Sequence, residues 1–259
     1  MPVYYRVVAR PTLLVTGLSG LIGTALRRHL GDRYDLRALN RRPVEGVATH
    51  RADIADLDAI APAFAGVQAV VHLAARVGSD APPFDEILRA NVTGTYNVLE
   101  SARRAGVPRV VFASSGATVS ACERDEPYRS LVAGRYDGLR GWPMLTHQTP
   151  VRPAGLYGAS KVWGEALGRH YADAHDLSVL CVRIGRVNAE DRPLGARDFS
   201  VWCSQRDIVR MLERCVEAPL TLRYDVFFVT SRNRWSYRDL GHAREVLGFE
   251  PLDSADAHR

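Results

Sequence analysis

One tyrosine and one lysine are spaced for acid–base chemistry. Lys161 is the only lysine among the 34 lysine and arginine residues of the chain, and Tyr157 precedes it by four residues. Residues four apart share one face of a helix, where an ammonium can favour the phenolate and lower the phenol pKa. Such a pair is a general acid/base suited to hydride chemistry. Arginine would serve poorly, because its guanidinium is a broad fork that stays protonated. The alternative is chance, since one lysine must fall somewhere and Tyr-x3-Lys alone is a weak motif.

A glycine-rich segment near the start of the chain has the spacing of a phosphate-binding turn. It reads Thr16-Gly17-Leu18-Ser19-Gly20-Leu21-Ile22-Gly23. The glycines permit a tight turn, close approach to a pyrophosphate, and packing of a helix on a strand. The phosphate then lies at the helix N-terminus. The segment follows an apolar run and opens an amphipathic one, which favours this interpretation over an ordinary strand–helix turn.

The residues that follow the second apolar run bear on the choice of dinucleotide. Asn40 and Arg41 lie about twenty residues after Gly20. An acidic residue at such a place binds the ribose hydroxyls of NAD, whereas arginine accommodates the 2′-phosphate of NADP. The pair therefore favours NADP over NAD. A solvated turn containing Arg41 and Arg42 is the competing interpretation.

These residues require a framework of alternating strands and helices. Short apolar runs alternate with amphipathic stretches, which indicates a parallel sheet covered on both faces. Right-handed crossovers make it a doubly wound α/β sheet of the Rossmann type, with a small C-terminal substrate-binding portion. We predict strands at 13–16, 36–39, 47–51, 69–73, 110–113 and 178–184, and helices at 21–30, 84–104 and 157–174.

The whole chain, 1–259, is expected to form a single Rossmann-type domain. Its cofactor part spans about 11–185, and its substrate part about 120–155 and 186–259. Residues 120–155 combine prolines and glycines with Tyr128, Tyr136, Trp142 and Met144. A long irregular segment is usually functional or disordered, and its aromatic residues favour a packed lid.

Composition excludes several classes of protein. Hydrophobic residues make up 46% and charged residues 24% of the chain, as in an ordinary globular protein. The net charge of +5 comes from scattered arginines, so we expect attraction for anionic small molecules and no nucleic-acid partner. The four cysteines show no C-x-x-C spacing, so no metal site is expected. No apolar run approaches membrane-spanning length and no signal peptide is seen, so a cytoplasmic location is expected.

Taken together, these motifs resemble the extended short-chain dehydrogenase/reductase family, which includes the NAD-dependent epimerase/dehydratases. The resemblance covers nearly the whole chain. Besides the glycine loop and the Tyr/Lys pair, it rests on Ala52-Asp53-Ile54, Val71-His72-Leu73-Ala74-Ala75, Asn91-Val92-Thr93-Gly94-Thr95 and Ser114-Ser115. The combination is far more specific than any one of these motifs.

The resemblance implies a role for each matching residue. Tyr157 is the general acid/base, and Lys161 lowers its pKa and holds the nicotinamide ribose. Ser115 orients the reacting oxygen, and Ser114 is the alternative candidate for this role. Asn91 supports a proton-relay water, or else it is a structural helix residue whose hydrogen bonds are satisfied. His72 is expected to be structural. The implied cofactor-binding residues are Gly17, Ser19, Gly20, Leu21, Ile22, Gly23, Asn40, Arg41, Asp53, Ile54, Leu73, Ala74, Ala75, Tyr157, Lys161 and Ile184.

Within the family, the short C-terminal half is most similar to uronate dehydrogenases, which oxidise the anomeric carbon of a hexuronate. By that similarity Arg197 holds the substrate carboxylate, although a surface ion pair with Asp191 or Asp198 is a close alternative. The implied substrate-binding residues are Ser79, Ser115, Gly116, Tyr157, Arg186 and Arg197. The chain departs from that pattern at two of these positions, since Gly116 replaces an asparagine and Arg186 a serine. Its 120–155 segment is also longer.

The leading hypothesis is an NAD(P)-dependent oxidoreductase that acts on a small polar hydroxyl or carbonyl compound, such as a uronate or related sugar. A sugar epimerase with a retained cofactor is the alternative, and a dinucleotide-sensing regulator is disfavoured because the Tyr/Lys pair is kept. Dehydration is disfavoured because Ser115 is not followed by the Asp-Glu pair of the dehydratases. The helices at 84–104 and 157–174 are the family's usual dimer surface, so a homodimer is expected.

Overall fold

The computed structural model describes residues 10–78 and 83–259. Its centre is a seven-stranded sheet in the order β3-β2-β1-β4-β5-β6-β7, with every neighbouring pair parallel. The strands are β1 (Thr12–Thr16), β2 (Asp35–Asn40), β3 (Ala48–Arg51), β4 (Ala69–His72), β5 (Arg109–Ser115), β6 (Ser178–Ile184) and β7 (Tyr224–Val229). The predicted doubly wound parallel sheet is confirmed.

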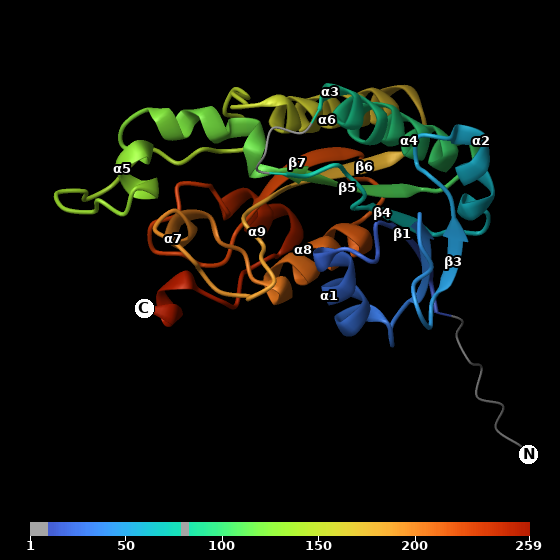
Figure 1. The fold of residues 1–259 in the computed structure, drawn as a ribbon, viewed down its shortest axis with the longest axis horizontal. Helices are drawn as coiled ribbons and strands as arrows, with labels where there is room; N and C mark the ends of the chain where they lie inside the picture. The colour runs from blue at the N-terminus through green and yellow to red at the C-terminus, as the bar shows by residue number, and fades with distance from the viewer. Residues whose placement is uncertain (1–9, 79–82) are drawn as a thin grey trace, which may run out of the picture.

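Helices cover both faces of the sheet (Figure 1). One layer contains α1 (Leu21–Leu30), α8 (Gln205–Glu217) and α9 (Gly241–Leu247). The opposite layer contains α2 (Leu57–Ile60), α3 (Phe84–Ile87), α4 (Gly94–Arg104) and α6 (Leu156–Ala174). Two short helices, α5 (Tyr128–Val132) and α7 (Asp198–Val201), lie outside these layers.

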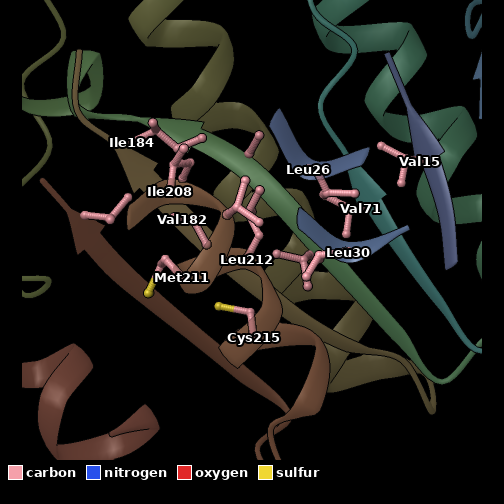
Figure 2. Close-up of a cluster of buried hydrophobic side chains, with 14 of the residues drawn as sticks. Val15, Leu26, Leu30, Val71, Val182, Ile184, Ile208, Met211, Leu212 and Cys215 are labelled. Carbon is pink, nitrogen blue, oxygen red and sulfur yellow. The ribbon is translucent and has the colours of Figure 1, made fainter. Parts of the chain in front are cut away.

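The two helical layers divide the apolar side chains of the central strands. Val15 and Leu13 belong to the cluster under α1 and α8, whereas Leu14 between them belongs to the cluster under α2, α4 and α6. Figure 2 shows the first cluster, where Leu212 and other side chains of α8 meet the sheet. Because successive strand residues point to opposite faces, an unbroken apolar run is needed to bury both, at about 1.5–3 kcal/mol per large side chain.

The 120–155 segment is packed, as predicted. It begins within a 3₁₀ helix (Gly116–Arg124) that continues from β5, and then passes through α5. Tyr136 stacks on Trp235 with ring centroids 3.9 Å apart, and Leu131 and Leu145 are buried with Tyr237 in the same cluster. The segment therefore joins the C-terminal part beyond the strand ends (Figure 1).

Two parts of the fold differ from the prediction. The helix expected at 84–104 is interrupted by a π-helical turn, Leu88–Thr93, between α3 and α4. Such turns insert an extra residue and occur often at functional sites. The prediction also placed no elements after residue 184, where the structure has β7, α7, α8 and α9.

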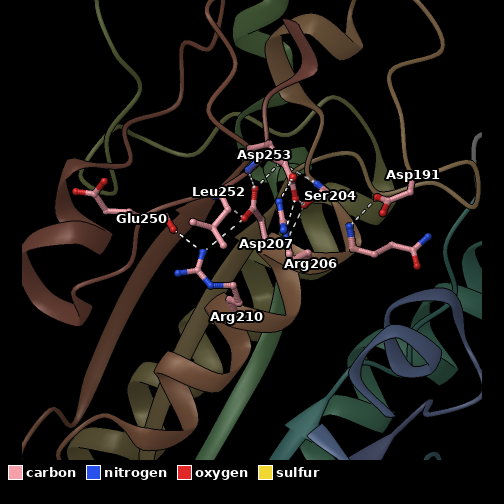
Figure 3. A network of polar contacts seen from close by, with 10 residues as sticks. Asp191, Ser204, Arg206, Asp207, Arg210, Glu250, Leu252 and Asp253 are labelled. Atoms are coloured by element: carbon pink, nitrogen blue, oxygen red, sulfur yellow. Dashed lines mark hydrogen bonds and ion pairs between the residues drawn. The ribbon is translucent and has the colours of Figure 1, made fainter. Parts of the chain in front are cut away.

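A buried carboxylate fixes the C-terminal segment to α8 (Figure 3). Asp207 is fully buried and accepts hydrogen bonds from Ser231 Oγ at 2.7 Å and from the Leu252 amide at 2.7 Å. A third bond comes from the Asp253 amide at 3.1 Å. The carboxylate thus satisfies backbone donors of a segment that has little regular structure.

Candidate active site

The glycine-rich turn joins β1 to α1 with a shape that only glycine permits. Gly17 has φ of +73°, and a Cβ there would lie 2.9 Å from the backbone nitrogen of Ala74. A Cβ at Gly23 would lie 2.4 Å from the carbonyl oxygen of Leu18. The turn stays exposed at Ser19 and Gly20, and Gly20 caps α1 without a side-chain hydrogen bond. The first amides of the helix are thus available to a phosphate, so these residues fit a dinucleotide.

The carboxyl ends of β2 and β3 supply the remaining predicted dinucleotide residues. The Leu18 amide donates to Asn40 Oδ1 at 3.0 Å, so Asn40 holds the glycine turn itself. Arg41 is exposed beside it. Asp53 accepts from Arg89 Nη2 at 3.0 Å and from the Ala55 amide at 2.9 Å. Burial would raise the pKa of Asp53, but these hydrogen bonds and the Arg89 charge outweigh it and hold the pKa below its usual value.

The structure brings Ser115, Tyr157 and Lys161 together at the carboxyl end of β5. Ser115 ends the strand, caps the 3₁₀ helix, and accepts the Ala117 amide at 3.1 Å through Oγ. The side chain of Tyr157, from the first turn of α6, lies near enough to that of Ser115 for the serine hydroxyl to lower the Tyr157 pKa. Lys161 Nζ lies 5.6 Å from the centroid of the Tyr157 ring and donates to the Ala113 carbonyl at 2.7 Å.

The pKa of Tyr157 differs from the expectation. Burial raises it above its ordinary value, and the neighbouring Ser115 hydroxyl lowers the pKa only in part. Burial also lowers the pKa of Lys161 to about 8, although the nearby Glu165 charge opposes this. The expected lowering of the phenol pKa by Lys161 is therefore not seen, because both groups are desolvated. In this arrangement Tyr157 is a neutral phenol that can donate a proton.

Asn91 lies in the π-helical turn and is 2% exposed. Its Oδ1 accepts the Arg76 amide at 2.7 Å, and its Nδ2 donates to the Arg76 carbonyl at 3.1 Å and to Ser160 Oγ at 2.9 Å. These contacts tie the loop after β4 to α6. The Asn91 side chain thus has hydrogen-bond partners for both its oxygen and its nitrogen, as expected for a structural helix residue. Its expected support of a proton-relay water stays a prediction.

Two residues near the site have structural contacts instead. Ser114 Oγ donates to Glu165 at 2.5 Å, and Glu165 forms a buried, two-bonded pair with Arg183 at 2.8 and 2.9 Å. The Ser114 hydroxyl is therefore occupied by its hydrogen bond to Glu165. Ser115 is then the serine that faces Tyr157. Burial and the Lys161 charge lower the pKa of His72 to about 3, so it stays neutral, as a structural residue.

The predicted substrate residues have partners that the sequence did not indicate. Arg197 pairs with Glu123 of the 3₁₀ helix through two hydrogen bonds of 2.7 Å, rather than with either aspartate considered above. Arg186 forms an ion pair with Asp198, in which Arg186 Nε lies 3.0 Å from Asp198 Oδ1. Binding of a substrate carboxylate by Arg197 stays a prediction, and Ser79 lies outside the described residues.

Sequence reasoning missed Arg238 altogether. It is 2% exposed, and its guanidinium lies against Gly116, the residue after Ser115. The sequence carried no signal for it, because it is one arginine among many. Within 10–78 and 83–259 there is no group of three potential metal ligands, and no helix of that part is long and apolar enough to cross a membrane.

Comparison with known proteins identifies the class. The family model for the NAD dependent epimerase/dehydratase family matches residues 13–247. The chain belongs to this family, that is, to the extended short-chain dehydrogenases/reductases, as its motifs and sheet indicated. It is an enzyme of that family, and its relatives fit the predicted oxidoreductase better than the epimerase alternative.

Individual relatives cover most of the chain. It is 37% identical to an NAD-dependent glucose-6-phosphate dehydrogenase of Haloferax volcanii, over 94% of each protein. It is 34% identical to a uronate dehydrogenase of Agrobacterium fabrum, over 95% of this chain and 86% of the relative. The crystal structure of uronate dehydrogenase from Agrobacterium tumefaciens superimposes with a TM-score of 0.81 at 33% identity, covering 97% of this chain and 88% of the other. A mutant of a protein with that name was solved in complex with NAD.

Proposed function

We propose that the protein is a sugar dehydrogenase that oxidises the anomeric hydroxyl of an aldose or uronate with NAD(P). The observation that carries the proposal is the meeting of Ser115, Tyr157 and Lys161 at the same carboxyl edge of the parallel sheet as the glycine turn. The names of its relatives include glucose-6-phosphate, uronate and L-arabinose 1-dehydrogenases. These names have in common a sugar as the molecule oxidised.

In the proposed reaction, the sugar hydroxyl lies between Ser115 Oγ and Tyr157 OH. Ser115 orients the oxygen, and the Tyr157 phenolate accepts its proton as the carbonyl forms. Nicotinamide, when bound, supplies the hydride acceptor at the sugar carbon. Because burial raises the Tyr157 pKa, oxidation should accelerate as pH rises, and reduction should be favoured where the phenol is protonated.

The division of the chain follows from this proposal. Residues 11–185 hold the dinucleotide, and residues 120–155 and 186–259 shape the sugar pocket. A preference for NADP over NAD is supported by the exposed Arg41 and the absence of a carboxylate at Asn40. Asp53 is already paired with Arg89.

A cytoplasmic homodimer is part of the same proposal. Five large apolar side chains are exposed on α3, α4, α6 and the turn between α3 and α4: Phe84, Leu88, Tyr96, Leu156 and Trp163. These helices are the ones on which the family resemblance places a dimer surface, and a contiguous exposed apolar surface is typical of an interface. Size-exclusion chromatography with light scattering tests this part directly.

Steady-state formation of NADH or NADPH with a panel of sugars tests the activity. Tyr157→Phe should reduce kcat by about 100-fold or more, the scale of lost acid–base assistance, while dinucleotide binding stays measurable by fluorescence quenching. Absence of reduced cofactor with every hexuronate, aldose and sugar phosphate would refute the proposal. Interconversion of sugar epimers without net cofactor reduction would establish the epimerase alternative instead.

A further inference from the structure

A buried arginine fills the space beside the residue that follows Ser115. A Cβ at Gly116 would lie 2.2 Å from Arg238 Cζ and 2.3 Å from each of its two terminal nitrogens. Only a glycine at this position leaves room for the guanidinium. Arg238 follows β7 by nine residues, so the tertiary fold alone brings it to the catalytic serine.

The charge of Arg238 is not neutralised by hydrogen bonds. Among the residues that the structure describes, its buried Nε and Nη1 have no partner. Its Nη2 lies 4.0 Å from Glu123 Oε1, which is beyond hydrogen-bond distance. Glu123 is already engaged by the two bonds from Arg197 and by Tyr237 OH at 2.6 Å. The cluster of Arg197, Arg238 and Glu123 therefore carries one excess positive charge.

A buried donor without an acceptor is costly, and a buried cation more so. Such groups are rare in native structures, and a bound ligand or ion is one way in which they are satisfied. Arginine suits an acceptor-only group with two oxygens, because its fork can donate two parallel hydrogen bonds. The guanidinium of Arg197 donates two hydrogen bonds to Glu123. Arg238 is therefore the arginine of this cluster that has unused hydrogen-bond donors.

We propose that Arg238 recognises an anionic group of the sugar, the carboxylate of a uronate or the phosphate of a sugar phosphate. The inference rests on the proposed dehydrogenase function and names its substrate class. Gly116 is then a specificity residue as well, because its missing side chain admits the guanidinium. Arg197 acts indirectly by holding Glu123 away from Arg238.

The test measures kcat/KM for galacturonate, glucose 6-phosphate, galactose and glucose. An anionic sugar should exceed its neutral counterpart by about 100-fold, the value of charge-assisted hydrogen bonds of up to 3 kcal/mol. Galacturonate and glucose 6-phosphate distinguish carboxylate from phosphate. Arg238→Met should reduce the ratio of kcat/KM for the anionic sugar to kcat/KM for its neutral counterpart to near one, since the lost bonds are made to the anion.

Two further variants sharpen the result. Arg234→Met is the matched control, since Arg234 lies four residues away and is exposed over the Trp235 ring. It should keep the preference. Gly116→Ala should also remove the preference for the anionic sugar, because the new side chain displaces the guanidinium. Agreement between the two variants excludes a folding defect of one variant as the cause. Tm values establish that each protein is folded.

The outcomes separate this inference from the proposed function. Preferred turnover of a neutral sugar, or an unchanged preference in folded Arg238→Met and Gly116→Ala, overturns the role of Arg238 while the dehydrogenase stands. If no sugar reduces the cofactor, the function fails, and calorimetric titration with galacturonate and glucose 6-phosphate decides the inference. If either anionic sugar binds to the wild-type protein and not to Arg238→Met, the role of Arg238 is supported. If neither sugar binds to the wild-type protein, that role is overturned.

Discussion

Replacing Lys161 by methionine should abolish activity and make the protein more stable. The ammonium is 3% exposed, and its hydrogen bond is to the Ala113 carbonyl. Burial lowers its pKa from 10.5 to about 8. At roughly 1.4 kcal/mol per pKa unit, this corresponds to about 3 kcal/mol of cost for keeping the charge in the fold. Methionine removes the charge but leaves the carbonyl unpaired, at about 1 kcal/mol, so we expect a gain of about 1–3 kcal/mol at pH 7.

The pKa shift of Lys161 determines how the stability difference between wild type and Lys161→Met changes with pH. The folded-state pKa of Lys161 lies below the unfolded value, so the unfolded chain binds more protons between pH 8 and 10.5. The stability contributed by this group in the wild type therefore rises with pH across that window. The cost of the buried charge is fully present below pH 8. The advantage of Lys161→Met should accordingly shrink between pH 8 and 10.

Urea unfolding of both proteins at pH 7, 8.5 and 9.5 measures the difference. A Tm increase of about 2–4 °C per kcal/mol is expected for a chain of this size. Lys161→Arg is the matched control, because it keeps the charge. It should lose about 100-fold or more in kcat without the gain in stability. A Lys161→Met variant less stable than wild type at pH 7, or wild-type turnover in Lys161→Arg, would refute the reasoning.

Three further predictions concern the cofactor site and the core. Arg41→Ala should weaken NADP binding by about 1–3 kcal/mol more than NAD binding; equal Kd changes by fluorescence titration would place Arg41 away from a 2′-phosphate. Gly17→Ala should weaken both dinucleotides and lower Tm, because φ is +73° and the new Cβ would meet the Ala74 backbone; unchanged Kd values would contradict the close approach. Glu165→Gln should cost about 3–5 kcal/mol in urea unfolding by breaking the buried pair with Arg183, and a loss under 1 kcal/mol would show that water or Ser114 compensates.

The part of the fold from β1 to β6 could be predicted from the sequence because its signals are local. The apolar runs that become β1, β4, β5 and β6 must be buried on both faces, and this alone implies a parallel sheet between helices. The glycine turn is local at Gly23, where a Cβ would meet Leu18 of the same turn, whereas a Cβ at Gly17 would meet Ala74, which follows β4. Tyr157 and Lys161 share a helix, so their spacing predicted their meeting.

The surroundings of Arg197 could not be predicted in the same way. Glu123, Arg197 and Arg238 come from three separated segments, and no spacing within the chain links them. Which carboxylate pairs with which arginine depends on how the 120–155 segment packs on the C-terminal part. The sequence suggested an aspartate near Arg197, but the packing supplied Glu123 instead.

The sequence by itself determined the apolar runs of the sheet, the glycine-rich turn and the placement of Tyr157 and Lys161 on one helix face, because short-range geometry fixes each of them. Only the tertiary structure decided the electrostatics. It showed that burial raises the pKa of Tyr157 and lowers that of Lys161. It also showed that Arg238, two of whose buried nitrogens have no hydrogen-bond partner among the described residues, lies against Gly116. Desolvation and charge pairing depend on everything that surrounds a group, and those neighbours come from distant parts of the chain.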